Sequence, residues 1–146
     1  MKRVADIMTR VPVTVEPENS VATAIRLMRK DNLRRLPVVE DGELVGMVTS
    51  GDLRRITGLS SILNDQSQDN FLWYHIPIAN VMSKNPITLS PDAPVSEAAR
   101  LIVEYKIGGL PVLDDDELVG IITATDLLQC LIKVGSCQDA VDVASG

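Results

Sequence analysis

Apolar and polar positions along the chain follow two periods, that of a strand and that of a helix. The first elements they predict are one of each. Residues 12–15 read Pro-Val-Thr-Val, the alternation of a short strand. Apolar residues then recur at helical spacing after Ser20, a residue type that favours the N-cap. A similar helix is expected near residue 95. The expected apolar faces are Val21, Ala24, Ile25, Leu27 and Met28 in the first helix, and Val95, Ala98, Ala99, Ile102 and Val103 in the second.

A hairpin and a closing helix are expected next. The apolar runs 36–39 and 44–48 flank Glu40-Asp41-Gly42, which is typical of a tight turn between antiparallel strands. Pro37 places the first of these strands at a sheet edge, or places the proline at its first residue. A closing helix begins near Asp52. The predicted order is β-α-β-β-α.

This pattern occurs twice in fixed register. Residues 8–17 resemble 82–91, and residues 43–49 resemble 117–123, always 74 positions apart. Leu-Pro-Val-Val at 36–39 likewise corresponds to Leu-Pro-Val-Leu at 110–113. Three matches in one register indicate a duplicated structural unit. The predicted organisation is repeat 1 at 1–57, a bridging segment at 58–77, repeat 2 at 78–134 and a C-terminal tail at 135–146.

The bridging segment contains most of the aromatic residues, among them Phe71, Trp73 and Tyr74. Two interpretations stay open: a helix or loop that covers the core, or a contact between subunits, where Trp and Tyr are favoured. One small repeat alone buries too little surface to offset its chain entropy. We therefore expect an α+β fold in which two repeats pack sheet to sheet with pseudo-twofold symmetry, and two clefts along the seam.

Four motifs present in both copies resemble the cystathionine-β-synthase (CBS) domain family: the Met-Thr or Met-Ser opening, Pro-Val-Thr-Val, Leu-Pro-Val-Val, and Gly-x-x-Thr-x-x-Asp-Leu. The two copies cover about four-fifths of the chain. The resemblance implies a tandem pair, or Bateman module, that commonly dimerises. It also implies clefts that bind adenine nucleotides or adenosyl ligands and so regulate an enzyme, channel or transporter.

The clearest candidate chemistry is a Thr-x-x-Asp turn in each copy, Thr49 with Asp52 and Thr123 with Asp126. A carboxylate can accept hydrogen bonds from both hydroxyls of a ribose, and the Thr hydroxyl adds a further polar contact. The amides of the following helix favour a nearby phosphate. The same spacing also forms a capping box that needs no ligand, so both interpretations stay open.

The copies differ at Arg34-Arg35, which is replaced by Gly108-Gly109 in the second repeat. In the related family this position often reaches phosphate, and two guanidiniums would supply several donors. The alternative is a solvated pair that stabilises a helix end. The difference predicts unequal clefts, with the Arg-containing one preferring a phosphorylated nucleotide.

The resemblance places the base contacts of each cleft on the opposite repeat. Most of these side chains are apolar, as expected around an adenine, and each of them could instead belong to the core. For the cleft of Thr49 and Asp52 they are Met82, Ile87, Ile107 and Gly108; for the cleft of Thr123 and Asp126 they are Met8, Val13, Leu33 and Arg34.

Composition and charge exclude several classes of partner and location. The net charge of −6 argues against nucleic acid as the main partner, and no apolar stretch is long enough for a membrane span. Asp6 lies where a signal peptide would begin its apolar run, so we expect a cytoplasmic protein. Cys130 and Cys137 are expected to be free thiols rather than a disulfide, and they do not form a zinc site.

These features predict a regulatory module rather than an enzyme. The single histidine, His75, and the lack of a glycine-rich phosphate loop disfavour catalysis. The expected effector is AMP, ADP, ATP or an adenosyl ligand, with no required cofactor or metal. The expected partners are a second copy of the chain and a regulated enzyme or transporter acting in trans. A structural or dimerisation module with vestigial clefts remains the alternative, and the chain is either a stand-alone sensor or a fragment.

Overall fold

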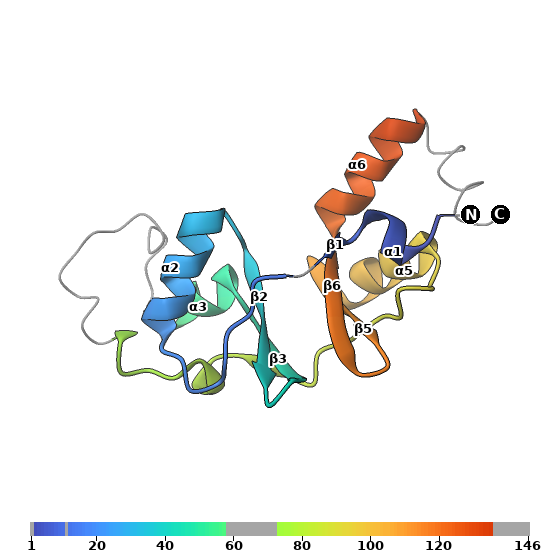
Figure 1. Cartoon of the computed structure of the whole chain (residues 1–146). Helices are drawn as coiled ribbons and strands as arrows, with labels where there is room; N and C mark the ends of the chain where they lie inside the picture. Colours follow the sequence, from blue (N-terminus) through green and yellow to red (C-terminus); the bar gives the residue numbers. More distant parts are fainter. Residues whose placement is uncertain (1, 11, 58–72, 136–146) are drawn as a thin grey trace. The chain divides into compact units, whose positions relative to one another are not determined.

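The computed structural model describes residues 2–10, 12–57 and 73–135, and it divides into two compact units of mixed helix and strand (Figure 1). One unit, here called the continuous unit, is Val13–Pro86, and the other, the split unit, combines Met1–Pro12 with Ile87–Gly146. The α+β prediction is confirmed. The expectations for Phe71, Cys137 and the end of the tail lie outside the described residues.

The two units have matching elements in the same order around their sheets. Those of the continuous unit are α2 (Val21–Asp31), β2 (Arg35–Glu40), β3 (Glu43–Thr49), α3 (Ser50–Thr57), the 3₁₀ helix η2 (Ile78–Asn80) and β4 (Ser83–Lys84). Those of the split unit are α1 (Val4–Ile7), β1 (Thr9–Arg10), α5 (Val95–Tyr105), β5 (Gly109–Asp114), β6 (Glu117–Thr123) and α6 (Ala124–Val134).

Each sheet has three strands, and its third strand comes from the opening of the other repeat. The orders are β2-β3-β4 and β1-β6-β5, so β1 lies beside β6 although they are far apart in sequence (Figure 1). The run 12–15, predicted as a strand, instead contributes one parallel bridge from Val15 to Val38. Val15 donates its N–H to the carbonyl of Pro37, 3.0 Å away. The exchange of opening segments was not anticipated from the sequence.

The hairpins form as predicted. β2 pairs antiparallel with β3, and Pro37 lies in β2, an end strand of its named sheet. At the turn, Asp41 and Gly42 have φ of 52° and 82°. Two successive residues with positive φ are the signature of the turn that matches strand twist.

The cores consist mainly of aliphatic side chains from helices and strands, and Trp73 is also buried in the core of the continuous unit. Ser20 caps α2 as predicted, because its hydroxyl accepts from the Thr23 amide at 3.2 Å. Most predicted core positions are buried or half-buried. Val103 is the exception, since it is 77% exposed, whereas Leu101 is buried in its place. In α5 the apolar positions extend around the helix, so spacing alone did not separate the inner residue from the outer one.

Two glycines allow the opening segments to approach the sheets. A Cβ on Gly46 would lie 2.6 Å from the Met82 sulfur, and one on Gly120 would lie 2.6 Å from the Met8 sulfur. Backbone oxygens of Ser83 and Thr9 lie within 3 Å of the same points. The glycine of the Gly-x-x-Thr-x-x-Asp motif is therefore required for packing of the third strand.

Candidate functional site

Each Thr-x-x-Asp turn lies where the central strand of its sheet ends and a helix begins. In the first turn, Asp52 accepts the Thr49 amide at 2.8 Å, and the Thr49 hydroxyl accepts the Asp52 amide at 3.1 Å. In the second turn the same two bonds, between Thr123 and Asp126, measure 2.9 and 3.2 Å. The capping-box interpretation is confirmed for both turns. The caps occupy one oxygen of each carboxylate, so they do not exclude a ligand at the other oxygen.

The second carboxylate oxygen distinguishes the two turns. Oδ1 of Asp52 accepts from Arg55, which lies one helical turn further along α3, and Asp52 is only 5% exposed. The corresponding position in α6 is Gln129, and Asp126 is half-buried. Among the residues that the structure describes, no side chain donates to Oδ1 of Asp126. Arg55 was not predicted from the sequence, although its spacing of three from Asp52 and its replacement by Gln129 in the second copy are visible there.

The loop before each hairpin lies against the turn of its own unit. The Arg34 carbonyl accepts the Ser50 amide at 2.9 Å, and the Gly108 carbonyl accepts the Ala124 amide at 3.0 Å. Arg35 is paired with Thr49 across the strands. The first turn therefore has two arginines beside it, and Arg34 is exposed. The second turn has the two glycines and no cation at these positions.

The remaining candidate residues divide over the two units. Met82, Val13 and Leu33 belong to the continuous unit, together with the first turn. Met8, Ile87, Ile107 and Gly108 belong to the split unit, together with the second turn. Met82 and Met8 each pack on the motif glycine of their own sheet. The assignment of all these residues to base contacts stays a prediction.

Three further features of the described residues concern metal ligands, membrane spans and cysteine. Over residues 2–10, 12–57 and 73–135, no group of three or more His, Cys, Asp or Glu side chains could hold a metal ion. Nor does any helix in these ranges have the length and apolar character to cross a membrane. Cys130 is buried on α6 as a free thiol.

The fold and the duplicated turn define a pair of small α+β repeats, and comparison with known proteins identifies their family. The family model described as the CBS domain matches residues 4–57 and 78–133. The chain belongs to the CBS domain family.

One relative and two solved structures show the similarity over nearly the whole chain. A CBS domain-containing protein of Dictyostelium discoideum is 37% identical over 90% of this chain and 92% of its own. The CBS domain pair of protein MJ0100, solved with 5′-methylthioadenosine and S-adenosyl-L-methionine, is 30% identical, with a TM-score of 0.77 over 91% of this chain and 98% of its own. CBSX2, solved with AMP, is 28% identical, with a TM-score of 0.77 over 92% and 98%.

Proposed function

We propose that this protein is a regulatory sensor that binds an adenine nucleotide or adenosyl ligand at its Thr-x-x-Asp turns and thereby controls a partner. The observation that carries the proposal is the second turn, where Asp126 keeps one carboxylate oxygen without a donor among the described residues. An ionised oxygen beside a helix start is suited to accept hydrogen bonds from ribose hydroxyls. The AMP of CBSX2 and the adenosyl ligands of MJ0100 support this class of ligand.

The different charges beside the two turns predict that the turns bind different ligands. Arg34 and Arg35 adjoin the first turn, and Gly108 and Gly109 adjoin the second. We propose that the first turn takes the phosphate-bearing ligand and that the second takes an uncharged or cationic adenosyl group. Control of a partner requires that the ligand bind one conformation of the module more tightly than another. We propose that the partner is an enzyme or transporter, that the module acts as a homodimer in the cytoplasm, and that it has no catalytic activity of its own.

One observation favours the alternative of a structural module for the first turn. Both oxygens of Asp52 already accept hydrogen bonds, from the Thr49 amide and from Arg55. A ribose there must displace Arg55, whose side chain is 74% exposed. Because the guanidinium of Arg55 is largely in solvent, ribose hydroxyls can replace it as donors to Oδ1 of Asp52.

Isothermal titration of AMP, ATP, adenosine and S-adenosyl-L-methionine into the wild type and Asp126→Asn tests the proposal. The Asn side chain keeps an oxygen for the Thr123 amide but loses the charge and one acceptor. We expect adenosyl binding at the second turn to weaken about tenfold or more, since a hydrogen bond to a charged group contributes about 1.5–3 kcal/mol. Equal affinity in both proteins would reject the ribose contact. Thermal unfolding of both proteins controls for loss of the cap.

A further inference from the structure

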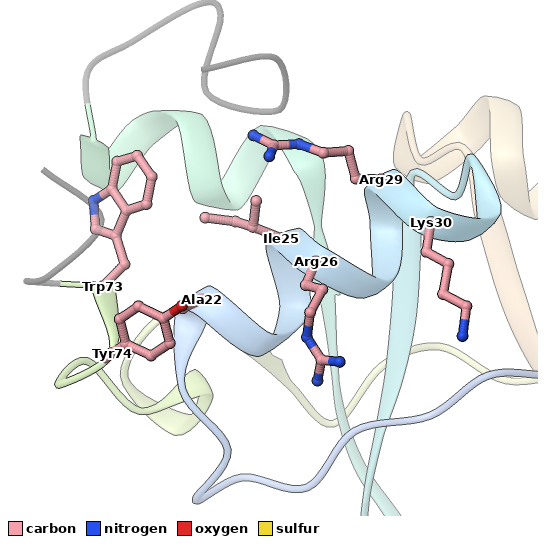
Figure 2. A pocket seen from close by; sticks show the side chains of 7 residues that line it. All are labelled: Ala22, Ile25, Arg26, Arg29, Lys30, Trp73 and Tyr74. Carbon is pink, nitrogen blue, oxygen red and sulfur yellow. The ribbon is translucent and has the colours of Figure 1, made fainter. Parts of the chain in front are cut away.

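A second feature of the continuous unit is a hollow beside α2. The hollow, of about 470 Å³, is lined by α2 and by two aromatic residues of the bridging segment. Figure 2 shows Ile25 between the two aromatic rings on one side and the helix cations on the other. The lining residues are Ala22, Ile25, Arg26, Arg29, Lys30, Trp73 and Tyr74.

The rim of this hollow is positive although the chain is acidic overall. Arg26 lies three and four positions before Arg29 and Lys30, so these cations are neighbours on the surface of α2. All three are exposed. No acid in the described ranges forms an ion pair with Arg26 or Lys30. Arg29 already has an interaction within the protein, so Arg26 and Lys30 carry the inference.

The matching helix of the split unit shows that this charge is particular to α2. In α5, Arg100 corresponds to Arg26, and it is held by Glu97 at 2.7 Å and Glu104 at 2.6 Å. Glu104 also replaces Lys30, and Val103 replaces Arg29. Two glutamates therefore neutralise Arg100 in α5, whereas no acid among the described residues pairs with Arg26 in α2.

The shape of the hollow favours an extended ligand over a single compact anion. Figure 2 shows Arg29 directed to one side of α2, with Arg26 and Lys30 directed to the other, so the cations do not converge on one point. Tyr74 is 64% exposed and lies beside the buried Trp73 and Ile25. These three side chains form an apolar surface next to the charges. Several separate carboxylates and one apolar side chain would complement this arrangement.

We propose that this hollow binds an acidic peptide segment with an apolar anchor residue, presented by the protein that the module controls. The anchor packs over Ile25 against Tyr74 and the edge of Trp73, and flanking carboxylates pair with Arg26 and Lys30. The inference rests on the proposed control of a partner, but it does not depend on nucleotide binding.

Trp73 provides the measurement, because it is the only tryptophan in the chain and lines the hollow. The full chain is titrated with the capped peptide Asp-Glu-Leu-Glu-Asp-Glu while tryptophan fluorescence is recorded. We expect a saturable change, and binding about tenfold weaker in Arg26→Glu/Lys30→Glu because two attractions become repulsions. The control Lys2→Glu/Lys133→Glu changes the net charge equally at exposed sites elsewhere and should bind as the wild type does. A peptide with Gly in place of Leu should bind more weakly.

Three results would overturn the inference. The first is no fluorescence change, or equal affinity in both charge-reversal variants. The second is equal binding of inorganic triphosphate, which would indicate a small-anion site. The third is a monomer produced only by Arg26→Glu/Lys30→Glu in sedimentation, which would assign the face to a second copy of the chain. Titration of AMP into the same variants separates the two proposals, because unchanged AMP binding with no peptide binding rejects only this one.

Discussion

The first and second turns have the same backbone frame and different surroundings. Both Asp side chains cap their helices with bonds that agree within 0.1 Å. Around the first carboxylate lie Arg55 and the Arg34-Arg35 pair, whereas Gln129 and the Gly108-Gly109 pair occupy those places at the second. Duplication preserved the part that builds the strand-to-helix junction. The charges that would select a ligand are free to differ, because they contribute little to folding.

The largest expected effect is on stability. It tests whether the third strand packs equally closely on the motif glycine of both units. Gly46→Ala and Gly120→Ala each place a Cβ 2.6 Å from a methionine sulfur and within 3 Å of a backbone oxygen. We expect each to lower the free energy of unfolding by about 1–3 kcal/mol, as overpacking does. Thermal and urea unfolding measure this. Gly51→Ala, whose Cβ would meet nothing closer than 3.6 Å, is the control and should not destabilise. A tolerated Gly46→Ala would show that the third strand is loosely held in the continuous unit.

The next largest effect is on ligand preference, and it tests the difference in positive charge between the two turns. Arg34→Gly gives the first turn the residue that the second copy has at Gly108. We expect the preference for AMP over adenosine at that turn to fall about tenfold, because a charge-assisted contact to phosphate is lost. Calorimetric titration of both ligands measures the ratio. Lys106→Gly, which removes an exposed cation at the end of α5 in the split unit, serves as the charge-matched control. An unchanged ratio would mean that Arg34 is a solvated helix-end residue.

A smaller effect comes from exchanging the residues one helical turn beyond each Asp. Arg55→Gln frees Oδ1 of Asp52, and Gln129→Arg offers a guanidinium to Oδ1 of Asp126. We expect ribose binding to strengthen about two- to fivefold at the first turn and to weaken by a similar factor at the second. Titration of adenosine into each variant checks this. Changes in the same direction at both turns would show that Arg55 does not compete with ligand.

The smallest expected effect concerns the pair of Glu97 and Arg100 on α5, which has no counterpart on α2. The hydrogen bond from Arg100 lowers the pKa of Glu97 from its ordinary value of 4.5, and Thr23 replaces this glutamate in α2. A lowered folded-state pKa contributes stability above about pH 4.5 that is lost as the pH falls through the folded value. The melting temperature of the wild type should therefore exceed that of Glu97→Gln slightly at neutral pH, and the difference should vanish in acid. A melting-temperature difference that stayed the same in acid would show that this ion pair is not its source.

The features that could be predicted well from the sequence are formed by residues that lie close together in the chain. The Asp41-Gly42 turn and the Ser20 cap are local, so residue type and spacing were sufficient. β1 and β4 were missed because each has two exposed residues and hence no periodicity, and because Thr9 pairs with Ile121, more than a hundred residues away. The candidate Asp residues were found by repetition. Whether they act as caps alone cannot be deduced from a spacing that serves both purposes.

The exchanged opening strand also affects the order in which the chain can fold during synthesis. The continuous unit, Val13–Pro86, is complete as soon as its own residues have left the ribosome. The split unit begins at the N-terminus, but β1 has no strand to pair with until β6 emerges. At roughly 5–20 residues per second, this delay is on the order of ten seconds. We expect the segment that contains β1 to be protected late, so it is exposed to chaperones and proteases until β6 has been made.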